Sequence, residues 1–190
     1  MSALLLRPFA YLAIKHGSNR LPALNWGLPV LTAAALLAAG ALLAPSANLF
    51  HATGLFDRLL GFVQNLPGFY LAALAAVATF GREGLDQLMP GTPPRVTILY
   101  NGQPLEIQLT RRRFLTMMFA YLTALSIGIT LVLVTILAVV NPVARVFPHG
   151  IVAPARVAAA FVIFVFAAQM IIITMWGLYY LGERMHTPDN

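Results

Sequence analysis

The chain has 190 residues, of which 59% are hydrophobic and only 9% are charged, with a formal net charge of +6. Soluble domains carry about 25% charged residues, so the composition excludes an ordinary soluble domain and predicts an integral membrane protein. The absence of cysteine also excludes disulfides, thiolate metal sites and thiol nucleophiles.

The N-terminal segment contains a short apolar run, Pro8 to Ile14, between two basic residues. This run is too short to cross a hydrocarbon core of about 30 Å. We predict that residues 1–23 are cytoplasmic and that Leu4 to His16 form a helix along the membrane interface. Phe9 and Tyr11 are expected in the headgroup layer.

Four stretches without a formal charge each reach the roughly 20 apolar residues that a spanning helix needs. We therefore predict an all-α membrane fold with two transmembrane hairpins, residues 24–80 and 114–181. The four spanning helices are expected at Leu24 to Ala44, Leu59 to Phe80, Phe114 to Val140, and Val157 to Leu181.

Two of these helices contain or adjoin helix-breaking residues. Gln64-Asn65 and Pro67-Gly68 interrupt the second helix near one end, which predicts a kinked spanning helix, with a partly re-entrant segment as the alternative. Asn141-Pro142 follows the third helix and predicts that it ends there.

The insert between the two transmembrane hairpins, residues 81–113, is the only sizeable polar piece of the chain. A short helix is expected at Leu85 to Met89, before a proline-rich break. From Arg95 to Leu109, apolar and polar residues alternate on both sides of Asn101-Gly102. Asn-Gly is the strongest short-range signal for a two-residue hairpin turn, so we predict a β-hairpin over 95–109.

An isolated two-stranded hairpin is marginally stable in water, so its apolar face needs a cover. We consider three covers: the Leu85 to Met89 segment, hairpins of neighbouring copies, and an edge strand of a cytosolic partner protein. A simple connector that packs on its own chain is the further alternative. The residues expected to dock a partner or to mediate self-assembly are Val96, Ile98, Tyr100, Asn101, Gly102, Leu105, Ile107 and Leu109.

Basic residues are distributed unequally between the two ends of the predicted helices. Nine Arg and Lys residues flank one side and three flank the other. Because cytoplasmic loops retain the positive charge, both termini, including the tail 182–190, are expected in the cytoplasm. The run Arg111, Arg112, Arg113 is expected to bind lipid headgroups or an acidic partner surface. The net charge therefore requires no nucleic-acid partner.

The third predicted helix carries two rows of residues at helical spacing. Small residues recur every four positions, at Ala120, Ala124 and Gly128, and allow another helix to approach closely. Hydroxyl residues form a mildly polar stripe, at Thr116, Thr123, Ser126 and Thr130. Three interpretations remain open: hydroxyls bonded to carbonyls of their own helix, an oligomer seam, or the lining of a pore.

Gln169 is the one amide deep in the fourth predicted helix. Within hydrocarbon an amide needs a hydrogen-bond partner. We expect this partner to be a Thr or Ser of the third helix, or a group across a subunit interface.

Catalytic motifs are missing from the sequence. The four histidines are scattered, all six carboxylates lie outside the predicted helix cores, and no HExxH, GxSxG or P-loop pattern occurs. We predict a non-enzymatic protein without cofactor or metal that binds membrane lipids and self-associates. It would act as a sensor, an anchor or a regulatory subunit. A small oligomeric pore is the alternative.

The preference for Arg over Lys, with high Ala and Leu content, indicates a GC-rich bacterial genome and hence a bacterial inner membrane. A four-pass protein with an insert between its second and third helices resembles, in architecture, the membrane components of bacterial anti-phage systems such as Kiwa. The resemblance implies a membrane subunit of a multi-gene system.

Overall fold

The computed structural model describes residues 7–15, 22–43, 49–51, 53–79, 81, 83–89, 93–100 and 103–181. Four helices in these ranges are long and apolar enough to cross a membrane: Ala23–Leu43, Leu55–Thr79, Arg111–Val146 and Gly150–Tyr179. A mostly helical, multi-pass membrane protein is thereby confirmed, and each span overlaps one predicted stretch.

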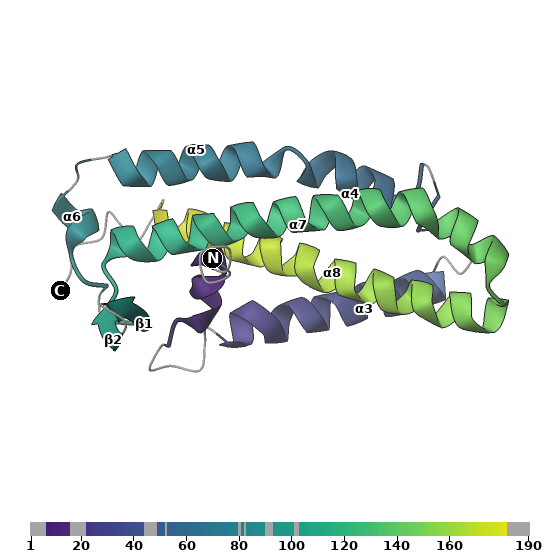
Figure 1. Ribbon diagram of the computed structural model, residues 1–190, viewed down its shortest axis with the longest axis horizontal. Helices are drawn as coiled ribbons and strands as arrows, with labels where there is room; N and C mark the ends of the chain where they lie inside the picture. Colours follow the sequence, from purple (N-terminus) through teal and green to yellow (C-terminus); the bar gives the residue numbers. More distant parts are fainter. Residues whose placement is uncertain are drawn as a thin grey trace.

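The spanning helices form a row (Figure 1). α7 (Arg111–Val146) packs between α5 (Leu66–Thr79) and α8 (His149–Tyr179), and α8 also packs on α3 (Leu28–Leu43). α7 and α8 are therefore the central pair, and fully buried side chains concentrate on them: Phe114, Leu115, Met118, Leu122, Leu133, Met170 and Ile173. α3 and α5 form the outer edges and expose many apolar side chains, as lipid-facing helices do.

The second span consists of two helices, α4 (Leu55–Val63) and α5, separated by a turn at residues 64–65. The side-chain amide of Asn65 donates to the carbonyl of Gly61 at 2.8 Å and satisfies a backbone group at the break. The predicted kink is confirmed, although the span begins four residues earlier than predicted.

The predicted ends of the third and fourth helices are wrong. α7 continues through Pro142 to Val146, and the N–H of Phe147 still donates to Val143 at 3.2 Å. Proline removes only one backbone bond, so the helix survives where the following turn keeps its own bonds. α8 begins at His149, where the Pro148 carbonyl accepts from Ile151 and Val152 at 3.0 and 3.2 Å.

The N-terminal segment is a 3₁₀-helix, η1 (Arg7–Ala13), that packs against α7. Tyr11, predicted at the membrane interface, has a side chain that is only 2% exposed and packs on α7. Its ring stacks on Tyr121 at a centroid distance of 5.3 Å and contacts Phe114 at 6.0 Å. Aromatic contacts with α7 therefore account for the burial of this side chain.

The hairpin is present as predicted. β1 (Arg95–Tyr100) and β2 (Gln103–Gln108) pair antiparallel, with Val96 opposite Ile107 and Tyr100 opposite Gln103. This register leaves a two-residue connection at the predicted position. The short helix before it, α6 (Glu83–Asp86), overlaps the start of the predicted range and ends before Leu88, which instead forms a β-bridge with Thr110.

The contact between α7 and α8 depends on a glycine. At position 177 a Cβ atom would overlap the buried Met118 side chain, whose Sδ lies 3.2 Å from that position. A Gly177→Leu variant is expected to lose about 1–3 kcal/mol of unfolding free energy through overpacking. Denaturant titration in detergent measures this loss, and adding Met118→Ala should restore part of it. Wild-type stability of the single variant would contradict the close approach.

Candidate functional site: the hairpin, its anchors and a buried polar network

Backbone hydrogen bonds tie the base of the hairpin to the rest of the chain on both sides. On the β1 side, Lys15 and Arg95 exchange two N–H···O bonds of 2.9 Å. On the β2 side, the N–H of Met89 donates to Leu109 at 3.3 Å and the N–H of Arg111 donates to Gln87 at 3.1 Å. The hairpin is therefore the centre of a small sheet-like platform rather than a free loop.

The apolar face of the hairpin is covered at its base and open toward its tip. Val96 and Leu109 are buried, in the same cluster as Leu85, and Ile107 is partly buried. Leu105, farther toward the tip on the same face, is 48% exposed. The own-chain cover considered above thus accounts for the base. The side chains of Ile98 and Tyr100, and all of Asn101 and Gly102, lie outside the described residues.

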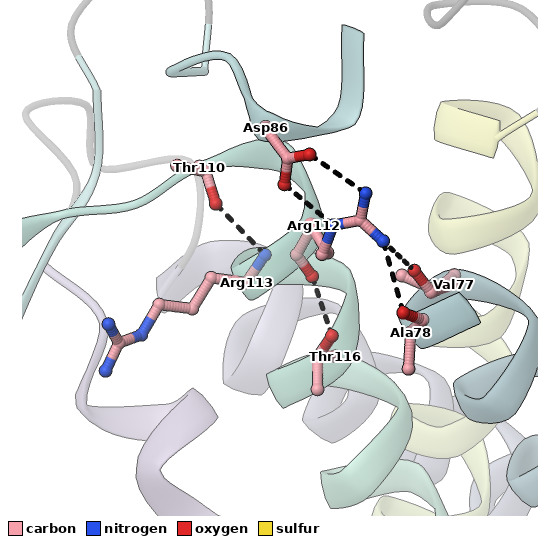
Figure 2. A network of polar contacts seen from close by, with 7 residues as sticks. All are labelled: Val77, Ala78, Asp86, Thr110, Arg112, Arg113 and Thr116. Atoms are coloured by element: carbon pink, nitrogen blue, oxygen red, sulfur yellow. Dashed lines mark hydrogen bonds and ion pairs between the residues drawn. The ribbon is translucent and has the colours of Figure 1, made fainter. Parts of the chain in front are cut away.

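Arg112 holds the platform to the end of α5 (Figure 2). Its Nε and Nη2 donate to the two carboxylate oxygens of Asp86 at 2.7 and 3.0 Å, and its Nη1 donates to the carbonyls of Val77 and Ala78 at 2.8 and 3.3 Å. These carbonyls belong to the last turn of α5, where intrahelical donors run out. The planar guanidinium fork therefore joins α5, α6 and α7 at one point.

The electrostatic consequence of this contact appears at Asp86. The Arg112 hydrogen bond, with a smaller charge attraction, holds the pKa of the Asp86 carboxyl below its ordinary value of 3.8. Thr110 begins α7 beside this contact, since its hydroxyl accepts from the N–H of Arg113 at 3.3 Å. Capping by a hydroxyl side chain fixes where the helix starts.

The three consecutive arginines do not form one surface patch. Arg111 is 5% exposed and Arg112 is engaged with Asp86 and α5, whereas Arg113 is exposed. Figure 2 shows the Arg113 side chain directed away from the contact around Arg112. Of the three arginines predicted to bind headgroups or a partner, Arg113 is therefore the one whose side chain is free to do so.

The hydroxyl stripe of α7 bonds to its own helix. Thr116, Thr123 and Thr130 donate to the carbonyls of Arg112, Phe119 and Ser126, each at 2.8 Å, and Ser126 donates to Thr123 at 2.9 Å. Thr123 and Ser126 are also buried. In the small-residue row, Ala120 and Ala124 are partly buried, and Gly128 is exposed with open space around it.

A buried polar network joins η1, η2 (Ala23–Gly27), α7 and α8. The hydroxyl of Tyr121 donates to Gln169 Oε1 at 2.7 Å, and Gln169 Nε2 donates to the backbone carbonyl of Asn25 at 2.5 Å. The hydroxyl of Tyr11 donates to Asn25 Oδ1 at 3.3 Å. Gln169 is fully buried, and its bonds with Tyr121 and Asn25 supply the partners that a buried amide needs.

Pro29 explains why the Asn25 carbonyl is available. In a regular α-helix this carbonyl would accept from the N–H of residue 29, but proline has no N–H. The chain here adopts the wider π-helix η2, a local form that often marks functional positions. The amide of Gln169 uses the freed acceptor.

The sequence thus predicted the helix of the Gln169 hydrogen-bond partner correctly and the residue type of that partner wrongly. Its α7 partner is Tyr121 rather than a Thr or Ser, and both bonds are within one chain. Tyr11, Asn25 and Tyr121 were missed as site residues. The available signal was the spacing of Asn25 and Pro29, which leaves an unsatisfied carbonyl within an apolar helix.

The anchors and the network form one continuous connection from the hairpin into the helix row. Lys15, two residues after the end of η1, bonds to β1, and Tyr11 of η1 belongs to the network. Lys15 Nζ also lies 3.3 Å from Glu106 Oε1 of β2, an exposed pair that contributes little by itself. Because every link is a bonded or packed contact, the hairpin is held in a defined orientation on the helices.

Comparison with known proteins finds no match: no family model, no curated protein and no solved structure is similar to this chain.

Proposed function

We propose that this protein is a non-enzymatic, self-associating subunit of the bacterial inner membrane that presents its hairpin to a soluble cytosolic protein. It acts as a sensor, an anchor or a regulatory subunit. The observation that carries the proposal is the contrast within the hairpin: its base is anchored by backbone bonds, while Leu105 near its tip is 48% exposed. A leucine on a rigid support gains about 1.5–3 kcal/mol when a partner protein buries it.

The orientation follows from charge. Nine of the basic residues flank the end that carries the hairpin and three flank the other end. Cytoplasmic sides of bacterial membrane proteins retain such an excess, so the hairpin and both termini face the cytoplasm.

The outer edge of β1 supports recognition through a partner strand. Both backbone groups of Arg95 point away from β2, because both bond to Lys15. Backbone groups two residues along a strand point the same way, so those of Thr97 also face outward. Among the described residues nothing pairs with them. A strand of the soluble partner added here would lie beside the open tip.

The alternative of a pore has less support. Hydroxyls that line a water-filled pore face the lumen, but those of α7 bond to carbonyls of their own helix, and two of them are buried. Self-association remains supported by Gly128, whose surface is open for close approach of a second copy.

The test is a Leu105→Glu variant, compared with Gln108→Glu, which adds the same charge on the opposite face of β2. Both full-length proteins are extracted from the native host in mild detergent and weighed by native mass spectrometry. Burial of a leucine contributes about 1.5–3 kcal/mol, so Leu105→Glu should weaken partner capture about tenfold or more. The Gln108→Glu protein should bind as wild type does.

Equal capture by both variants would contradict docking at the open tip. A homo-oligomer that carries no soluble protein, with wild type and with both variants, would leave the hairpin as a connector and remove the partner from the proposal.

A further inference from the structure

A cavity of about 570 Å³ lies between α3, α4 and α8, away from the hairpin and its anchors. Its walls are almost entirely apolar, with Leu37, Phe164 and Ile172 among them. Thr32 is the only polar residue of the lining, and its hydroxyl already donates to the carbonyl of Leu28 at 2.8 Å. The lining therefore offers no free polar group to hold water, and an apolar occupant fits it.

The rim of the cavity is open to the surroundings of the helix row. Leu36, Leu55, Val157 and Ile171 line it and are each about half exposed. Gly40 widens the space, since a Cβ at this position meets no atom within 4 Å. A flexible chain in the membrane can enter from the side without any helix moving.

The length of the cavity matches an acyl chain. Along α8 its lining extends from Val157 to Ile172, about 22 Å at a rise of 1.5 Å per residue. One leaflet supplies about half of a hydrocarbon core of roughly 30 Å. The acyl chain of one lipid in one leaflet would therefore fit within the cavity.

A cation marks one end of this cavity. Arg156 precedes the lining residue Val157, and its guanidinium carbon lies 6.0 Å from the ring centroid of Phe50, next to the lining residue Leu49. Its Nε is buried and meets no hydrogen-bond acceptor, and no carboxylate pairs with Arg156 within the described part of the chain. A buried donor of a charged group without an acceptor is costly, and no described residue neutralises the charge of this guanidinium.

We propose that this cavity is a phospholipid site, in which one acyl chain fills the space between α3, α4 and α8 and the lipid phosphate binds Arg156. The ring of Phe50 supports the guanidinium on one face by a cation–π contact. The terminal N–H groups of the Arg156 guanidinium, rather than the buried Nε, are the ones that would bind the phosphate, whose oxygens match the planar fork. Basic residues between transmembrane helices are a known means of holding lipid headgroups.

The site is tested with the full-length protein in phosphatidylcholine vesicles that contain phosphatidylglycerol with a photoreactive diazirine midway along one acyl chain. After irradiation, the adduct is measured by intact mass and located by peptide mapping. Adducts are expected on the cavity residues of α3 and α8. A Gly40→Phe variant fills the cavity and should lower the adduct about tenfold, by loss of apolar contact.

The matched control is Gly61→Phe, because Gly61 of α4 is exposed, has the same open space at its Cβ and does not line the cavity. It should label as wild type does. Arg156→Gln should also lower labelling about tenfold, because the charged hydrogen bonds are lost, and Arg156→Lys should retain more of it. Thermal denaturation in detergent confirms that each variant is folded.

Three results would overturn the phospholipid site. Labelling spread evenly over the exposed faces of all helices would mean bulk lipid contact. Equal labelling of the Gly40→Phe and Gly61→Phe proteins would exclude the cavity as the acyl site. Competition by inorganic phosphate as strong as that by unlabelled phosphatidylglycerol would leave only an anion site at Arg156. None of these results bears on the hairpin, since the two sites use different residues.

Discussion

Replacing Gln169 with leucine is expected to lower the unfolding free energy by about 1–3 kcal/mol, although leucine is the more apolar residue. Among the described residues, the Gln169 amide is the only partner shown for the hydroxyl of Tyr121, and it also donates to the carbonyl of Asn25. Removing it takes one hydrogen bond from each of these two buried groups. Denaturant titration of the purified protein in detergent measures the change.

A double-mutant cycle with Tyr121→Phe separates the hydrogen bond from side-chain volume. Tyr121→Phe alone leaves Gln169 Oε1 without its donor, whereas the double variant removes donor and acceptor together. We expect the two losses to be clearly non-additive, as for residues in direct contact. Strict additivity would show that the bond between Tyr121 and Gln169 does not contribute to stability.

Replacing Arg112 with leucine is expected to release the hairpin platform from the helices. The substitution removes both bonds to Asp86 and both bonds to the last turn of α5. Amide hydrogen exchange should become several-fold faster in residues 85–109 and change little in the centre of α8, because local opening depends on local contacts. Mass spectrometry of peptides from both regions measures this difference.

Arg113→Leu is the matched control, since it removes the neighbouring charge from an exposed side chain, and its exchange should equal that of wild type. The pH dependence gives a second control. Because Arg112 depresses the pKa of Asp86 in the folded protein, the stabilisation is complete above the ordinary value of 3.8 and is lost as pH falls through the depressed pKa. Acid should therefore loosen the wild-type platform and leave Arg112→Leu unaffected. Unchanged exchange in Arg112→Leu would mean that the backbone bonds alone hold the hairpin.

Elements with a clear local pattern were predicted well. The period-two alternation around Asn101-Gly102 predicted the hairpin, and the observed register, with Tyr100 opposite Gln103, agrees with it. Uncharged length predicted the four spans. These features depend on side-chain spacing along the chain, and no distant residue is needed to establish them.

Helix ends and side-chain partners were predicted less well. Pro142 did not end α7, because the turn after it keeps its own backbone bonds. Three consecutive arginines looked equivalent in the sequence, but Arg112 is the one whose side chain bonds to the carbonyls of the last turn of α5. The difference depends on where a helix that ends at residue 79 meets one that begins at residue 111.

The sequence by itself determined that this is a four-span membrane protein with a polar insert that contains a hairpin, because composition and periodicity specify which segments leave water and which remain in it. The tertiary structure alone decided which groups meet within the helix row. Asn25, Gln169 and Tyr121 lie far apart along the chain, and so do Gly40 and Arg156. The contacts among Asn25, Gln169 and Tyr121, and the cavity near Gly40 and Arg156, arise from the way the helices pack against one another. No local sequence pattern encodes this packing.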